Sequence, residues 1–208
     1  QVIQYEPQSL ILVDQAESDL YAIEREVKEM NYEVKVTLYL ADITNKERIS
    51  SIFQFHEPNV VFHAAAYKHV PLLEGQVKQA IQNNFIGTKV IAELAAKYES
   101  EKFILISTDK AVNPTNVMGA SKRLAEMVCQ ALQQSILSQE SMQANTIFSP
   151  STRFVIVRFG NVLGSTGSVI PKFREQIARG GPITVTHPDI SRYFMSIQEA
   201  AQLVLQAG

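Results

Sequence analysis

The segment from Ser107 to Arg123, STDKAVNPTNVMGASKR, holds the side chains of this 208-residue sequence that are best suited to acid–base chemistry. It follows an apolar run at residues 102–107 that predicts a buried strand, so Thr108, Asp109 and Lys110 would stand together where that strand ends. A hydroxyl, a potential acid and a potential base would then meet at one point. From chemistry alone, the charged pair could equally be a surface ion pair, which contributes little. Both interpretations stay open at this stage.

Polar or small residues also follow the other predicted strands, where the ligands of a doubly wound sheet bind. They are Asp14, Asp42, Ile43, Ala64, Ala65, Ala66 and residues 158–161. Asp14 could accept both hydroxyls of a ribose and would repel a 2′-phosphate, which favours NAD over NADP. Asp42 could accept from the adenine amino group, although either aspartate could instead cap the next helix. The alanines would let the backbone approach a cofactor closely.

Short apolar runs alternate with longer helical patterns, which predicts an α/β fold with a doubly wound parallel sheet. Runs without polar interruptions suit strands that are buried on both faces. We expect strands at residues 9–13, 34–40, 60–65, 102–107 and 154–159, and helices at 18–30, 46–55, 77–98 and 119–134. The apolar residues within 135–151 recur at no clear period, which predicts a surface loop or insertion. Because the pattern becomes irregular after Gly164, we place an NAD-binding Rossmann core at 1–164 and the start of a substrate-binding region at 165–208.

A dinucleotide-binding fold opens with a strand and a glycine-rich turn whose amides meet the pyrophosphate. Here residues 1–5 look like the tail of a helix, and no glycine occurs before Gly75. The first predicted strand ends at Asp14, where the second strand of such a fold carries its ribose-binding acid. We therefore expect the sequence to start about one βα unit late, without the first strand and the phosphate loop. The glycines of GNVLGSTG (160–167) imitate that loop, but no helix, strand and acid follow at the required spacing, so we expect a substrate-contacting loop there.

The composition is that of an ordinary globular protein, with 46% hydrophobic and 19% charged residues. A net charge of −2 gives no electrostatic footprint for nucleic acid or an anionic membrane. Neither a membrane-spanning run nor a signal peptide is visible, and no metal site is predicted. The single cysteine, Cys129, cannot form an intrachain disulfide, and we expect it to pack inertly in a helix.

Five segments in order resemble one known family: HAAAYKHVPLLE (63–74), NNFIGT (83–88), residues 107–123, RFGNVLGSTGSVIPKF (158–173) and THPDISRYFM (186–195). The family is the polysaccharide-biosynthesis branch of the extended short-chain dehydrogenases/reductases, and the nearest likeness is to UDP-N-acetylglucosamine 4,6-dehydratases of capsule and O-antigen synthesis. The resemblance implies that bound NAD oxidises C4 of the hexose, water leaves across C5 and C6, and the hydride returns to C6. We expect a homo-oligomer with a UDP-sugar substrate, located in the cytoplasm or as the cytoplasmic domain of an inner-membrane protein.

The resemblance also implies residue roles, because elimination needs one acid and one base. Asp109 would be the acid and Lys110 the base, while Thr108 would hydrogen-bond the 4-oxygen. Lys122 would bind the nicotinamide ribose with support from Asn83 or its neighbour Asn84. The fifth catalytic position of the motif is Met118, where most short-chain dehydrogenases have the tyrosine that accepts the 4-hydroxyl proton. Methionine is characteristic of many members of this branch, and it leaves the acceptor open among Lys122, Asp109 and water.

On the substrate side, the resemblance places Asn161, Ser165 and Arg192 at the sugar nucleotide, with Lys68 and His69 close to the pocket. Ordinary packing is an equally good interpretation of His69. Two other functions stay open. A 4-epimerase of the same superfamily also oxidises C4, but it needs no elimination pair and usually uses the tyrosine. A non-catalytic nucleotide-binding module would suit the absent glycine loop, although the acid, base and lysine together argue against it.

Overall fold

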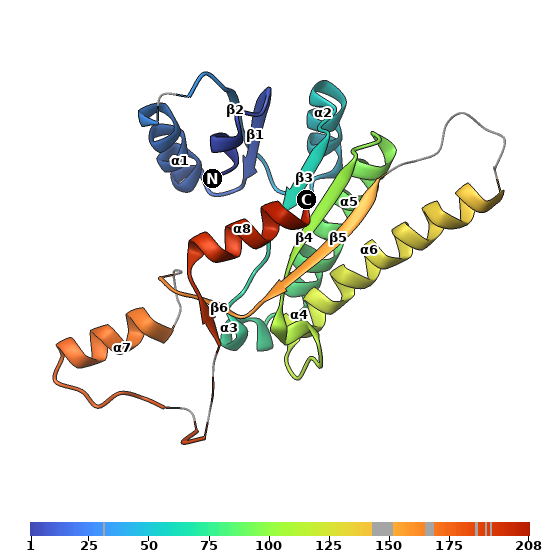
Figure 1. Ribbon diagram of the computed structural model, residues 1–208. Helices are drawn as coiled ribbons and strands as arrows, with labels where there is room; N and C mark the ends of the chain where they lie inside the picture. The colour runs from blue at the N-terminus through green and yellow to red at the C-terminus, as the bar shows by residue number, and fades with distance from the viewer. Residues whose placement is uncertain (31, 143–151, 165–168, 186, 190, 192) are drawn as a thin grey trace.

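Figure 1 shows the computed structural model of the chain, which describes residues 1–30, 32–142, 152–164, 169–185, 187–189, 191 and 193–208. The strands are β1 (Ser9–Asp14), β2 (Lys35–Leu40), β3 (Val60–His63), β4 (Lys102–Thr108), β5 (Arg153–Phe159), β6 (Asn161–Val162) and β7 (Phe194–Met195). The α-helices are α1 (Glu17–Glu29), α2 (Lys46–His56), α3 (Val70–Glu74), α4 (Val77–Ala80), α5 (Thr88–Lys97), α6 (Val117–Met142), α7 (Val169–Ala178) and α8 (Ile197–Ala207). Two 3₁₀-helices cover Val2–Tyr5 and Asp109–Ala111, and the π-helical segment Ile81–Gly87 joins α4 to α5.

The longer strands form two parallel sheets. In the first, β1 pairs with β2 from Ser9 opposite Lys35 to Asp14 opposite Leu40. In the second, β4 lies between β3 and β5, and its last residue, Thr108, stands opposite Phe159. Strand–helix–strand connections between parallel strands build the predicted doubly wound fold.

The two sheets follow each other in the order β2–β1 and then β3–β4–β5, and the described residues contain no strand paired with both β1 and β3. In the usual order of a doubly wound fold, the first strand lies at this place. A cavity of about 740 Å³ is found here instead, lined by both β1 and β3. This order agrees with the prediction that the sequence contains neither the first strand nor the phosphate loop.

The second sheet is covered on both faces, as the unbroken apolar runs predicted. Phe103 and Leu105 of β4 pack with α2, α5 and α6, and Cys129 lies in the same cluster. Ile104 points to the opposite face and packs with Val157 and with Val204 of α8, because side chains alternate along a strand. Figure 1 shows α8 crossing one face of these strands while α5 lies against the other.

All nine predicted strands and helices are present, with boundaries shifted by a few residues, and two expectations about the remaining chain need correction. Helix α6 continues to Met142, so the predicted loop at 135–151 is wrong for its first eight residues, while residues 143–151 lie outside the described part. The chain after Gly164 is not simply irregular, because it contains α7 and α8. Since α8 packs on β4 and β5, the chain returns to the core sheet there, and the domain boundary at 164 stays a prediction.

None of the helices in the described ranges combines the length and apolar character that a membrane crossing requires.

Candidate active site

The turn after β4 brings Thr108, Asp109 and Lys110 together as predicted. Asp109 Oδ1 accepts hydrogen bonds from Thr108 Oγ1 at 2.8 Å and from Lys110 Nζ at 3.0 Å. Burial raises the pKa of Asp109, but these hydrogen bonds and the charge of Lys110 outweigh it and hold the pKa below its usual range. The side chain of Asp109 is 52% exposed and that of Lys110 is 33% exposed, so the pair is accessible to a ligand.

Close packing against the start of α6 fixes this turn. A Cβ on Gly119 would come well inside 3.0 Å of the Lys110 carbonyl oxygen, so only glycine fits there without movement of the backbone. The Gly119 amide donates to Asn116 Oδ1 at 2.8 Å, and Ala111, the last residue of the 3₁₀-helix, is fully buried. The position of the Asp109–Lys110 turn is therefore coupled to the first turn of α6.

Lys122 lies one helical turn further along α6 and is buried against β4. Its Nζ donates to the carbonyl oxygen of Ile106 at 2.6 Å. Burial lowers its pKa to about 8, although the charge of Glu126, and that of Cys129 where its thiol is ionised, act in the opposite direction. A lysine near neutrality could donate or accept a proton at physiological pH.

Met118 is 5% exposed and packs with Leu73 and Ala80, with Val70 and Val117 around them. Its side chain fills an apolar cluster between α3, α4 and α6, and it is surrounded by hydrocarbon. This position therefore has a packing role that explains an apolar residue.

Glu126 is a buried acid that the sequence analysis did not single out. It is fully buried on α6, and its carboxylate accepts from Ser107, Arg123 and Arg158. The spacing of four from Lys122 was visible in the sequence and places both residues on one helical face. The partner on β5 could not be inferred, because the register of β4 and β5 was unknown.

The π-helical segment contributes Asn83 and Asn84, both buried. The side chain of Asn84 bridges the loop after β3 and α6: it accepts from the Tyr67 amide, donates to the Tyr67 carbonyl, and donates to Ser121 Oγ. Asn83 donates to Asn84 Oδ1. Among the hydrogen bonds of the described residues, neither side chain bonds Lys122, and the expected support of that lysine through backbone or water stays a prediction. Single-turn π-segments often occur at functional sites.

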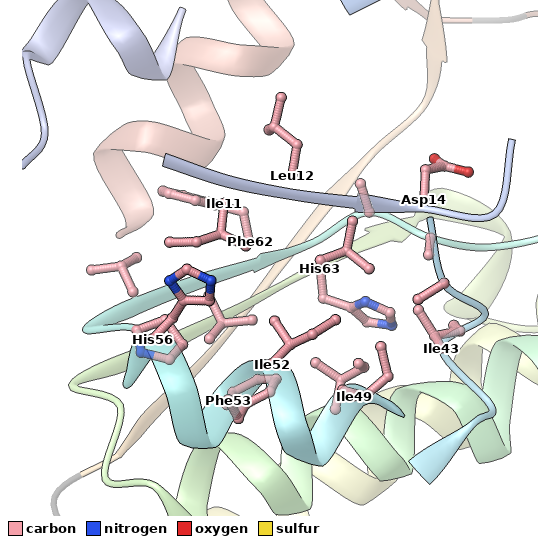
Figure 2. A pocket seen from close by; sticks show the side chains of 18 of the residues that line it. Ile11, Leu12, Asp14, Ile43, Ile49, Ile52, Phe53, His56, Phe62 and His63 are labelled. Carbon is pink, nitrogen blue, oxygen red and sulfur yellow. The ribbon is translucent and has the colours of Figure 1, made fainter. Parts of the chain in front are cut away.

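Most of the predicted cofactor residues line the cavity between β1 and β3. Those that line it are Asp14, Ile43, Ala64, Ala65, Ala66 and Asn83, whereas Asp42 and Lys122 do not. Figure 2 shows Ile49, Ile52 and Phe53 of α2 pointing toward the strands, with Asp14 at the carboxyl end of β1. The middle of the cavity is apolar, and polar residues line both of its ends. Asp14, Gln15 and Asn83 lie at the carboxyl ends of the strands, and Gln8, Glu57 and Asn59 at the opposite end.

The two aspartates do not act as helix caps. Asp14 Oδ1 accepts from the Ala16 amide and Asp42 Oδ1 from the Thr44 amide, which are local turns. The residue that caps α2 is Asn45. His63, which also lines the cavity, bonds Thr88 Oγ1, and burial lowers its pKa to about 3, so its ring is neutral.

The predicted substrate residues are only partly brought together. Asn161 in β6 bonds the Tyr193 carbonyl through its backbone and its side chain. Lys68 and His69 are exposed before α3 and do not line the cavity. Ser165 and Arg192 lie outside the described residues.

Comparisons with known proteins were made for the sequence and for the fold. A family model described as "Polysaccharide biosynthesis protein" matches residues 1–208. The chain is 50% identical to "Capsular polysaccharide biosynthesis protein CapD" of Staphylococcus aureus over 209 residues, which is 100% of this chain and 33% of that protein. It is 39% identical over 173 residues to a "UDP-glucose 4-epimerase" of Rickettsia rickettsii, covering 83% of this chain and 47% of that protein. The chain thus spans about a third of the length of CapD and about half that of the epimerase.

Among solved structures, Pen from Bacillus thuringiensis matches with a TM-score of 0.81 and 32% identity, over 99% of this chain and 58% of that one. DesIV, a dTDP-glucose 4,6-dehydratase from Streptomyces venezuelae solved with NAD, matches with a TM-score of 0.78 and 16% identity, over 100% of this chain and 66% of that one. The second likeness concerns the fold alone. The family and the fold class predicted from the sequence are both confirmed.

Proposed function

Because the chain belongs to the polysaccharide biosynthesis protein family, we propose that it acts in an NAD-dependent nucleotide-sugar 4,6-dehydratase. We propose UDP-N-acetylglucosamine as the substrate and a cell-surface polysaccharide as the destination of the product. The observation that carries the proposal is the hydrogen-bonded cluster of Thr108, Asp109 and Lys110 at the end of β4. A carboxyl group and an amine at 3.0 Å provide the acid and the base that elimination of water needs.

The residues at the strand ends fit a dinucleotide cofactor. Asp14 uses Oδ1 for the Ala16 amide, and among the described residues its Oδ2 has no hydrogen-bond partner, so this oxygen is available to a ribose hydroxyl. The end of β3 is followed by three small side chains, which leave room for a ligand there: Ala64, Ala65 and Ala66. Bound NAD would supply the hydride acceptor for C4 and the hydride donor for C6.

The elimination is balanced within the Asp109–Lys110 pair. A protonated Asp109 would donate its proton to the departing 6-hydroxyl, which leaves as water, and an uncharged Lys110 would take the proton from C5. The pair is then an aspartate and an ammonium, which is the ion pair that the structure contains. The low pKa of Asp109 keeps the pair in this form, so each elimination would first require transfer of a proton from Lys110 Nζ to Asp109 Oδ1 across their 3.0 Å contact.

A 4-epimerase is the second candidate, and the likeness to the Rickettsia enzyme favours it. Epimerisation needs no acid and base for the loss of water, and it usually relies on a tyrosine at the place of Met118. The apolar surroundings of Met118 and the accessible Asp109–Lys110 pair both favour the dehydratase.

The test uses the complete protein that carries this chain, with UDP-N-acetylglucosamine and NAD. The dehydratase predicts a product lighter than the substrate by one water, and a C5 hydrogen that exchanges with deuterated solvent. An unchanged mass with inversion at C4 would establish the epimerase. No turnover of any UDP-sugar would instead favour a non-catalytic nucleotide-binding module. Met118→Ala serves as a control, since it should lose packing only and keep the same product.

A further inference from the structure

The side chains of α6 that face β4 and β5 form one row. Lys122 and Glu126 are four residues apart, and both point at the strands that carry the Asp109–Lys110 turn. Lys122 reaches the Ile106 carbonyl of β4, and Glu126 reaches the Ser107 hydroxyl one residue further along the same strand. The helix is therefore attached to the last residues of β4 by a cation and an anion.

Glu126 also joins β4 to β5. Its Oε1 accepts from Ser107 Oγ at 2.6 Å and from Arg158 Nε at 2.7 Å, and its Oε2 accepts from Arg158 Nη2 at 2.6 Å. Ser107 and Arg158 stand opposite each other in the register of the two strands. A two-bond arginine–carboxylate contact fixes both distance and orientation.

The residues directly after this attachment are those of the candidate site. Ser107 is followed by Thr108 and Asp109, and Arg158 is followed two residues later by Gly160. A Cβ on Gly160 would lie 3.6 Å from Asp109 Oδ2, so the two strand ends approach each other closely there. A shift of either strand end would move the Asp109 carboxylate.

We propose that Glu126 is a positioning residue of the active site: by holding Ser107 and Arg158 together, it fixes the ends of β4 and β5 and with them Thr108 and Asp109. The proposal rests on the proposed function for its catalytic readout. Arg123 Nη1 adds a fourth donor at 2.9 Å, to Oε2, so each oxygen of the buried carboxylate accepts two hydrogen bonds. Burial raises the pKa of Glu126, but the donors outweigh this and keep its pKa below the usual range, so the group is an anion.

The same carboxylate acts on Lys122 through its charge. The titratable groups set against Lys122 in the described structure are Glu126 and Cys129 on its own helix and His63 at the end of β3. Burial lowers the pKa of Lys122, and the charge of Glu126 opposes that fall. His63 is neutral and the Cys129 thiol, whose pKa burial raises to about 12, is uncharged at neutral pH, so Glu126 is the anion that acts there.

The test compares Glu126→Gln, Glu126→Asp and Glu93→Gln in the complete protein. Glu93 is the matched control, because it makes exposed ion pairs with Lys46 and Lys89. We expect Glu126→Gln to lower kcat by about 10- to 100-fold, as small misplacements of reacting groups do, with KM for the UDP-sugar changed by less than about 3-fold and partial recovery in Glu126→Asp. Glu93→Gln should match the unmodified protein.

The pKa of Lys122, followed by NMR of labelled lysine amines, is a readout that does not require turnover. It should fall in Glu126→Gln and stay unchanged in Glu93→Gln. An unmoved Lys122 pKa, or an unchanged kcat, would overturn the proposal, whereas an inactive unmodified protein with a shifted Lys122 pKa would contradict the proposed function alone. If Glu126→Gln does not fold, Ser107→Ala removes only the attachment to β4; it should lower kcat by about 3- to 10-fold at constant KM, and an unchanged kcat would refute the positioning role.

Discussion

Substitution of Gly119 by alanine should damage the active site more than it damages stability. The added Cβ would collide with the Lys110 carbonyl oxygen and would lie 3.1 Å from the carbonyl carbon. Both atoms are backbone, so relief requires movement of the Asp109–Lys110 turn or of the first turn of α6. Rotation of a side chain cannot remove the clash.

The two effects of the substitution on folding partly cancel. Alanine is favoured over glycine inside a helix by about 1 kcal/mol, whereas forced overpacking costs about 1–3 kcal/mol. We therefore expect a net loss of roughly 0–2 kcal/mol of unfolding free energy, which lowers Tm by only a few degrees. To restore an ordinary contact of 3.4 Å the turn must move by roughly 1 Å, and a misplacement of that size can lower the rate about 10²-fold.

The assay measures kcat and Tm of the complete protein side by side. Gly75→Ala is the matched control, because a Cβ at that position meets nothing within 4 Å. It should leave both quantities unchanged. A Gly119→Ala protein that keeps its full kcat would refute the reasoning, since it would show that the turn can move without loss of activity. A protein that loses kcat only in proportion to its folded fraction would refute it as well.

Three further predictions concern single side chains. Asp109→Asn should lower turnover by about 10²- to 10⁴-fold while calorimetry shows unchanged binding of the UDP-sugar; the exposed Asp19→Asn is the control, and retained turnover would exclude Asp109 as the acid. Asp14→Ala should reduce the preference for NAD over NADP in kcat/KM, and an NADP preference in the unmodified protein would contradict the role of Asp14. Because burial lowers the pKa of Lys122 from 10.5 to about 8, the folded protein loses this proton first, so the unfolding free energy should rise between those pH values. Denaturant titrations should show that Lys122→Met lacks this rise, and an identical pH profile in the variant would contradict burial of a charged Lys122.

The sequence predicted the sheet well because its strands are buried on both faces. The run KFILIS has no polar interruption, and Phe103, Ile104 and Leu105 are fully buried in β4. The C-terminal end of α6 was not predicted. In a sequence, a helix is recognised by apolar residues that recur at helical spacing, and such residues mark only the part of a helix that has a buried face. Ile136 is buried, but Leu137 and Ser138 beside it are exposed, so the described side chains of α6 after residue 134 offer only this one buried apolar position.

Helix α8 was missed although its sequence carried a start signal. Ser196 and Glu199 form a capping box, in which each side chain bonds the backbone amide of the other residue. The apolar residues that follow pack on β4 and β5 through Val204. The residues before this capping box have no regular pattern of apolar positions. The helix was therefore not predicted, although the capping box marks its start.

In the candidate site too, contacts between neighbours in the sequence could be predicted, and contacts between residues far apart in the sequence could not. Thr108, Asp109 and Lys110 are consecutive, so a strand followed by a turn is sufficient to predict their contact. The rule that ligands bind beyond the carboxyl ends of strands led to Asp14 and to the three alanines after β3, which line one cavity in the structure. The contact of Glu126 with Arg158 joins residues 32 positions apart, and it depends on the register of two strands and the rotation of a helix.

The environment of Met118 bears on which group would accept the proton of the 4-hydroxyl. The thioether of Met118 accepts no proton usefully at neutral pH, and its side chain packs with Leu73 and Ala80 where most short-chain dehydrogenases have a tyrosine. Under the proposed function, Lys122, Asp109 or a water would then accept the proton from the 4-hydroxyl. By our proposal, the turn that carries Asp109 depends for its position on Gly119, which admits the turn, and on Glu126, which holds the ends of β4 and β5.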